Sequence, residues 1–207
     1  MSAGRLGALR GAAPLAVSLA LLAGCAPAQL RKEQLAGARR YACAAADAPR
    51  VWFTKTEVMR PDPTVLGAFG GRSFSSAEVA AWVDDELAAI ASPGFSVESG
   101  AQPSSGARLV VRPRILKAYL DGVAATKTAV VVLTFEFATP QGEVTARSYR
   151  GQQAGMNWGS SESEGSEALR DAAADCFEQL RVDLERMLHP TQSVPQACAA
   201  RPAAVAT

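Results

Sequence analysis

The sequence predicts an α+β domain in which two helices pack on one face of a mostly antiparallel sheet of about four to five strands. Two segments, 75–90 and 166–188, carry apolar residues at helical spacing. Between them, 109–150 holds three consecutive β-prone segments separated by turn residues, which is typical of an antiparallel meander. The resulting order, β-α-β-β-β-β-α, fits two layers that share one core.

The first expected strand covers 51–55, where β-prone residues follow one another. The stretch from Gly67 to Arg72 is glycine-rich and precedes a helix, a position at which backbone N–H groups can hold phosphate. It matches neither of the two glycine patterns typical of nucleotide-binding loops, so a mobile loop is expected instead.

The first helix is predicted to begin at Ser75, because Glu78 follows three residues later and completes a capping box. It ends before Pro93 and Gly94, which stop a helix. Its predicted buried face consists of Val79, Val83, Leu87 and Ile90.

Four strands are expected between the helices. A brief one at 95–98 is followed by 109–120, in which Pro113 lacks an N–H and therefore predicts an edge position or a bulge. The segment 128–138 alternates most strongly and is expected to be central, covered on one side and partly exposed on the other. The strand 143–150 completes the meander.

The stretch 151–165 is polar and rich in glycine and serine, which indicates a flexible loop. It contains Met156 and Trp158, the candidate contact residues for a partner, because an exposed tryptophan can anchor an interface. The alternative is a tryptophan that folds back over the edge of the core. The second helix, 166–188, ends at His189, and this single histidine at a frayed helix end disfavours a nucleophile–histidine catalytic pair.

The N-terminus has the features of a processing signal. Arg5 and Arg10 precede an apolar run, Ala12 to Leu22, which is too short to span a bilayer core of about 30 Å. The run closes with Leu22-Ala23-Gly24-Cys25, so that a cysteine stands directly after the small residues of a cleavage site. The alternative is an ordinary secretory signal followed by an incidental cysteine.

The four residues Leu22-Ala23-Gly24-Cys25 resemble the lipobox of bacterial lipoproteins. This resemblance implies that the Cys25 thiol receives a diacylglyceryl group, that cleavage between Gly24 and Cys25 removes a signal peptide (1–24), and that a fatty acid such as palmitate then acylates the new amine. Several acyl chains together hold a protein stably on a membrane, whereas one chain does not. Ala26, where an aspartate would imply retention at the inner membrane, implies the periplasmic face of the outer membrane in a Gram-negative bacterium.

After this cleavage 207 − 24 = 183 residues remain, enough for one domain with a core. We expect a lipidated, flexible tether (25–50), a periplasmic α+β domain (51–189) and a disordered tail (190–207). Removing two of the 21 basic residues leaves a formal charge of 19 − 20 = −1, which does not indicate a nucleic-acid partner. No cofactor is expected, and the cysteine spacings match no zinc pattern.

Lipidation of Cys25 leaves three cysteines, in a compartment that permits disulfides. A bond between Cys43 and Cys198, tying the two tails together, is favoured, and Cys43 with Cys176 is the alternative. Cys176 lies on the apolar face of the second predicted helix, where a cysteine usually serves as a small core residue.

The lipobox, the capped helix, the meander (109–150) and the closing helix together resemble small periplasmic lipoproteins. The plan is similar to that of YajG-type lipoproteins and of auxiliary lipoprotein subunits of ABC-type lipid transporters. The resemblance implies a non-catalytic accessory or scaffold subunit with a protein partner in the envelope. The alternative is a binding module for a lipid or small hydrophobic ligand, which requires an apolar pocket between sheet and helices. Beyond Cys25, fold analogy identifies no functional residue.

Overall fold

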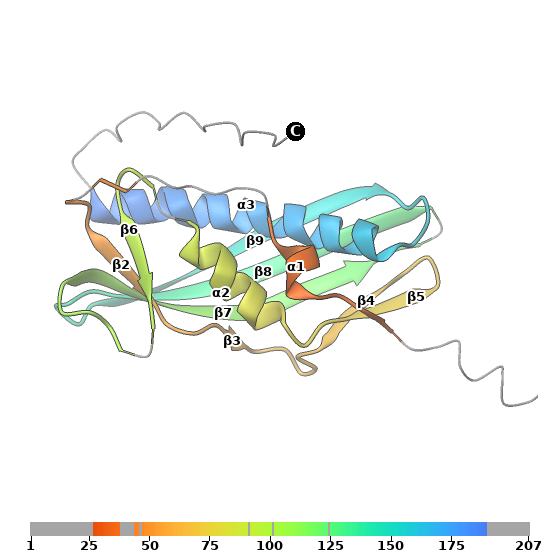
Figure 1. Cartoon of the computed structure of the whole chain (residues 1–207), viewed down its shortest axis with the longest axis horizontal. Helices are drawn as coiled ribbons and strands as arrows, with labels where there is room; N and C mark the ends of the chain where they lie inside the picture. Colours follow the sequence, from red (N-terminus) through yellow and green to blue (C-terminus); the bar gives the residue numbers. More distant parts are fainter. Residues whose placement is uncertain are drawn as a thin grey trace, which may run out of the picture.

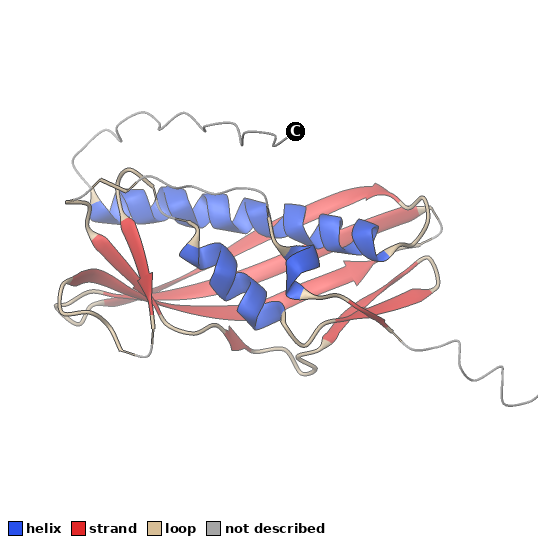
Figure 2. Ribbon diagram, viewed as in Figure 1, coloured by secondary structure: helices blue, strands red, loops and turns tan. Residues whose placement is uncertain are grey.

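The computed structural model describes residues 27–37, 44–45, 47–90, 92–100, 102–123 and 125–189. Within these ranges a nine-stranded mixed sheet is covered on one face by three helices (Figures 1 and 2). The α+β class is confirmed. The predicted signal peptide (1–24), Cys25, Cys43, Cys198 and the predicted tail (190–207) lie outside the described residues.

The elements follow one another in the order β1 (Ala28–Gln29), α1 (Lys32–Leu35), β2 (Arg50–Phe53), β3 (Glu57–Val58), β4 (Val65–Phe69), β5 (Arg72–Ser75), α2 (Val79–Ala88), β6 (Ser96–Ser99), β7 (Ala107–Asp121), β8 (Thr126–Ala138), β9 (Val144–Met156) and α3 (Glu162–Leu188).

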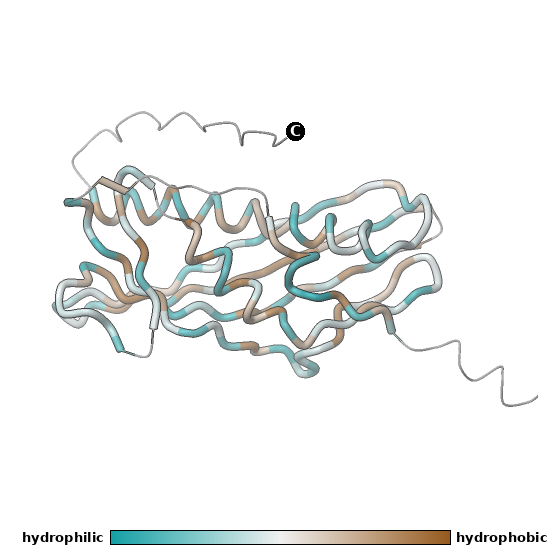
Figure 3. Tube along the Cα trace, viewed as in Figure 1, coloured by the Kyte–Doolittle hydropathy of each residue, from teal (hydrophilic) through white to brown (hydrophobic). Residues whose placement is uncertain are grey.

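The three longest strands form the predicted antiparallel meander, with β8 between β7 and β9. Alternate residues of β8 face the helices and are fully buried, whereas the residues between them are only partly buried, so the strand is central as predicted. Figure 3 shows apolar and hydrophilic residues interspersed along the long strands and along α3. The buried residues of β8 are Ala129, Val131, Leu133, Phe135 and Phe137.

The prediction of a mostly antiparallel sheet of four to five strands was wrong. Three short strands, β2, β3 and β4, pair in parallel with successive parts of β7, and β6 pairs in parallel with β2. These strands are two to five residues long. β2 and β6 overlap the predicted strands 51–55 and 95–98, whereas β1, β3, β4 and β5 were not predicted, because a period of two residues cannot be recognised over so short a run.

Pro113 lies within β7, which has neighbours on both sides. β2 pairs with β7 as far as Val111, and β3 begins pairing at Arg114. Pro113 therefore stands in the gap between two short partners, where no neighbour needs its missing N–H. The bulge of this strand lies between Ile115 and Lys117 instead.

The first long helix starts later than predicted. Ser75 belongs to β5, where it pairs with Gln29 of β1 and Val65 of β4, and the helix begins at Val79 without a side-chain cap. Strand pairing on both sides of β5 satisfies more backbone hydrogen-bonding groups than a helix cap at Ser75 would, so Ser75 is part of a strand. The predicted buried face of the helix is confirmed.

Two segments predicted as loops contain strands. Residues 67–72 comprise the end of β4, the turn at Gly70–Gly71 and the start of β5 rather than a mobile loop. The strand predicted to end at 150 continues to Met156, because β8 supplies a partner for every residue of 151–156. These residues are mostly exposed and include two glycines and two glutamines, which explains why they resemble a loop in the sequence.

Folded structure begins before residue 51. Within the expected tether, β1 pairs with β5, and Leu30 and Leu35 are buried in the core. The short helix α1 contacts both α2 and α3. Residues 27–37 are thus part of the packed domain rather than a flexible spacer.

The helix α3 lies along β8 and β9 and carries the predicted apolar stripe into the core. Cys176, on this stripe, is a buried free thiol whose Sγ lies 3.5 Å from the Val131 carbonyl oxygen, as expected for a core residue. Burial raises its pKa to about 12. At the end of the helix the His189 ring hydrogen-bonds to the Gly94 carbonyl at 2.7 Å.

Gly151 sets the distance between α3 and β9. A Cβ atom built on Gly151 would lie 1.7 Å from the carbonyl oxygen of Ala172 in α3, whereas one built on Gly155 of the same strand meets its nearest atom at 3.8 Å. Only a residue without a side chain therefore lets the helix lie this close to the strand.

We predict that Gly151→Ala lowers the free energy of unfolding by about 3 kcal/mol, because the helix must move away from the strand. The matched substitution Gly155→Ala should leave it nearly unchanged. Denaturant unfolding of both variants measures this difference, and equal stabilities would contradict the packing described here.

Candidate functional site

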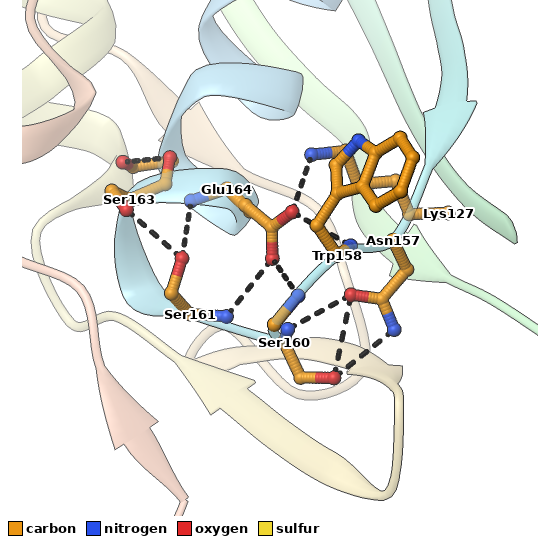
Figure 4. Close-up of polar contacts among 9 residues, drawn as sticks. Lys127, Asn157, Trp158, Ser160, Ser161, Ser163 and Glu164 are labelled. Atoms are coloured by element: carbon orange, nitrogen blue, oxygen red, sulfur yellow. Dashed lines mark hydrogen bonds and ion pairs between the residues drawn. The ribbon is translucent and has the colours of Figure 1, made fainter. Parts of the chain in front are cut away.

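The loop between β9 and α3, residues 157–161, is the candidate site (Figure 4). Its Trp158 side chain is 80% exposed, more than any other large apolar residue in the described part of the chain. Met156, the other predicted contact residue, ends β9 and is 54% exposed. The structure thus leaves both side chains accessible, as a contact role requires, and the identity of what they contact remains a prediction.

The Glu164 carboxylate holds this loop in place. It accepts backbone N–H groups from Trp158 at 3.0 Å, Gly159 at 3.1 Å and Ser161 at 3.2 Å. The Lys127 ammonium lies 3.6 Å from the same carboxylate. We call these residues the Glu164 clamp.

The clamp belongs to the start of α3. Ser161 is the N-cap, and its Oγ accepts the Glu164 N–H at 3.2 Å while the Glu164 side chain accepts the Ser161 N–H. This reciprocal pair is a capping box, a pattern of serine and glutamate three residues apart that is present in the sequence. Sequence reasoning started the helix at Ser166 and missed it.

The Glu164 carboxylate is charged throughout the physiological pH range. The Trp158 N–H is the largest influence that lowers its pKa, aided by Ser161, Gly159 and Lys127 and opposed by partial burial, and the pKa falls to about 2. A carboxylate that accepts several N–H groups is stabilised in its ionised form. It is thus suited to hold backbone rather than to exchange protons at neutral pH.

A second set of contacts joins the loop to two hairpins. Ser160 Oγ donates to the Gly70 carbonyl at 3.3 Å, and the Asn157 N–H donates to the Ala125 carbonyl at 2.7 Å. A Cβ on Gly70 would lie 1.7 Å from Ser160 Oγ, so the β4–β5 turn and the loop are in close contact. The flexible loop predicted at this place is a fixed one in the structure.

This arrangement is suited to binding. An indole already held in one position loses little conformational entropy when a partner covers it.

Within the described residues, no group of three or more histidine, cysteine, aspartate and glutamate side chains could hold a metal ion. In the same ranges, no helix combines the length and apolar character needed to cross a membrane.

The sheet face opposite the helices forms a second surface (Figure 2). Six rows of paired residues cross β7, β8 and β9 on this face, and the two flanking rows, Val110–Ala138–Val144 and Asp121–Thr128–Ala154, hold one carboxylate and no cation. The four rows between them run from Arg112–Glu136–Ala146 to Tyr119–Val130–Gln152. We call these rows, with Leu116 at the bulge and Glu57 beside them on β3, the outer rows. They hold four cations and two carboxylates, a difference of 4 − 2 = +2: Arg112, Arg114, Lys117 and Arg150 against Glu57 and Glu136.

Both carboxylates of the outer rows are engaged by arginines. Glu136 lies 2.9 Å from Arg112 and 3.4 Å from Arg114, and Glu57 lies 3.2 Å from Arg114. The Lys117 ammonium instead lies over the Tyr119 ring at 5.3 Å, and Arg150 donates to the Gln152 side chain at 3.0 Å. Lys117 and Arg150 flank Val132 in one row and supply the excess positive charge.

A groove of about 320 Å³ lies beside the last turn of α3, at the end of the sheet away from the loop 157–161. Its lining mixes Leu109, Phe137, Met187 and Leu188 with charged and polar residues. Those polar residues include Arg108, Gln141, Glu143 and Arg147.

The structure is similar to several solved bacterial proteins. A Xanthomonas campestris protein of the family model DUF330 is 12% identical, with a TM-score of 0.47 over 69% of this chain and 86% of that one. A lipoprotein from Neisseria meningitidis is 11% identical, with a TM-score of 0.38 over 64% and 97% of the two chains. A minor lipoprotein from Acinetobacter baumannii is 11% identical, with a TM-score of 0.37 over 67% and 93%.

No family model matches the sequence, and no curated protein matches it either. Two of these solved structures are lipoproteins. At 11–12% identity the likeness transfers no ligand, partner or site residue to this chain.

We predict that Glu164→Gln releases the loop, because a neutral amide accepts the three N–H groups more weakly than a carboxylate does. Hydrogen exchange at the Trp158, Gly159 and Ser161 amides should become faster. Glu167→Gln, an exposed change on the same helix, should leave these rates unchanged. Equal exchange in both variants would contradict the clamp.

The lowered pKa of Glu164 also fixes the sign of a pH effect. Its contribution to stability is complete above the ordinary carboxyl pKa, and it is lost as the pH falls from there towards about 2. The wild type should therefore lose more stability than Glu164→Gln over this acid range.

Proposed function

We propose that this protein is a non-catalytic lipoprotein of the cell envelope, anchored by lipid on Cys25 at the periplasmic face of the outer membrane. It serves as an accessory or scaffold subunit that docks on a protein partner. The anchor is supported by Leu22-Ala23-Gly24-Cys25 and by Ala26, which follows the cysteine. The docking role is supported by one observation above the others, the uncovered and positively charged outer rows.

The outer rows fit a protein surface that carries carboxylates. Antiparallel sheets often leave one face in water, and such a face is normally polar. Here Leu116 and Tyr119 are exposed large apolar side chains beside Lys117, a combination of apolar contact and charge that suits an interface. The excess of +2 favours an acidic partner, because complementary charge steers association and fixes the orientation of the two proteins.

The ligand-binding alternative has less support. It requires an apolar pocket between sheet and helices, where the described residues instead form one continuous buried core. The groove beside α3 is within the size range of small-molecule sites, but it contains Arg108, Glu143 and Arg147. This lining does not suit a lipid chain.

The anchor is tested with Cys25→Ser. We predict that this variant keeps its signal peptide, carries no acyl chains and no longer fractionates with the outer membrane, because only the acylated cysteine holds the protein there. Cys198→Ser, which leaves the motif intact, should remain with the lipids. A Cys25→Ser protein that matures at the same bond and stays in the lipid fraction would contradict the anchor.

The docking role is tested by crosslinking in the intact envelope. A photoreactive residue at Gln152, in the outer rows, should crosslink to one defined acidic protein, whereas the same residue at Glu167, exposed on α3, should not. Charge reversal of Lys117 and Arg150 to glutamate should abolish that adduct, because the partner then meets like charge. Adducts of equal yield from both positions, or an adduct insensitive to the reversal, would rule out this surface.

A further inference from the structure

The chain enters the folded domain beside the β4–β5 turn. β1 lies parallel to β5, with Ala28 opposite Phe74 and Gln29 opposite Ser75. Because the two strands run in the same direction, the chain before Ala28 comes from the side of Arg72 and the turn at Gly70–Gly71. Figure 1 shows β1 at the end of the molecule where the β4–β5 hairpin lies.

The same end carries the exposed tryptophan. Ser160, two residues after Trp158, donates its hydroxyl to the Gly70 carbonyl, and β9 and α3 meet here (Figure 1). Met156 pairs with Thr126, whose N–H donates to the Val123 carbonyl at 3.1 Å. We call the turn at Gly70–Gly71, Val123 and residues 156–160 the Trp158 end.

Three large apolar side chains project from the Trp158 end into solvent. Val123 is 76% exposed, Met156 54% and Trp158 80%. Polar contacts made by neighbouring backbone and side chains hold the loop in this conformation, so the exposure is built into the fold. Such a cluster indicates a surface that something covers.

The length of chain before β1 identifies what covers it. Cys25 stands three residues before Ala28, and three extended residues span at most about 11 Å. A lipid on Cys25 therefore holds the start of β1, and with it the Trp158 end, against the headgroups of the bilayer. There is no room for a partner protein between this end and the membrane.

We infer that Trp158, with Met156 and Val123, inserts into the headgroup region of the bilayer as a second membrane contact. This inference rests on the proposed lipidation of Cys25. Tryptophan suits the position, because its ring favours the boundary between headgroups and acyl chains while its N–H stays hydrogen-bonded. The acyl chains supply attachment, and the fixed indole sets the orientation of the domain on the membrane.

Quenching by brominated lipid tests this contact, because bromine on an acyl chain quenches only an indole that reaches it. Full-length, lipidated protein is placed in phosphatidylethanolamine–phosphatidylglycerol vesicles with or without brominated chains. Trp52 and Trp82 are 8% and 2% exposed, so both are shielded by the fold and emit equally in the two lipids. We expect the brominated lipid to remove most of the Trp158 emission and none of the remainder.

The matched control moves the tryptophan to the other end of the same strand. Trp158→Phe combined with Val144→Trp exposes an indole at the start of β9, 12 residues and about 40 Å from Met156. This emission should be the same in both lipids. Trp158→Phe alone should remove the bromine-sensitive emission, and since Trp158 is exposed, the fold should be unaffected.

The outcomes separate this inference from the proposed function. Mass spectrometry of the same sample shows whether Cys25 carries lipid, and its absence overturns both the anchor and the membrane contact. If Cys25 carries lipid but brominated lipid does not quench the Trp158 emission, the membrane contact alone is overturned. Trp158 shielded from an aqueous quencher but insensitive to bromine would show a protein contact and also overturn it.

Discussion

The parallel pairing of β1 with β5 is the constraint on which the orientation of this molecule depends. It incorporates residues 28 and 29 into the sheet, which begins only three residues after Cys25, the cysteine of the predicted lipobox. A long flexible tether would let the domain turn freely above the membrane. With the lipid that we propose on Cys25, a connecting segment of at most about 11 Å instead places one end of the domain at the membrane.

The remaining features of the structure are consistent with that assignment. The Glu164 clamp fixes an exposed indole at the end of the domain where the chain enters. Gly151 lets α3 lie close to β9. β7 and β9 both end at the Trp158 end, so in the proposed orientation they run toward the bilayer and the long strands stand upright on it (Figure 1). The outer rows then face sideways, where a periplasmic or membrane partner can reach them.

The sequence predicted the parts of the fold that repeat over many residues. The alternation of 128–138 identified β8, and the apolar stripe ending at Leu188 identified α3, because each pattern extends over several periods. The sequence-based prediction was wrong where pairing with a distant strand determines the local structure, as at Ser75 and at residues 151–156. Met156 and Trp158 were found by composition, but their fixation was not, since the contacts at Gly70 and Ala125 join residues far apart in the chain.

Neutron reflectometry of the full-length, lipidated protein on a supported bilayer measures the thickness of the protein layer along the membrane normal. With the Trp158 end against the lipid the strands stand upright, and the layer is about 50 Å thick, because β7 extends over 15 residues. A layer of about 20 Å, the thickness of one sheet and one helix lying flat, would contradict this orientation.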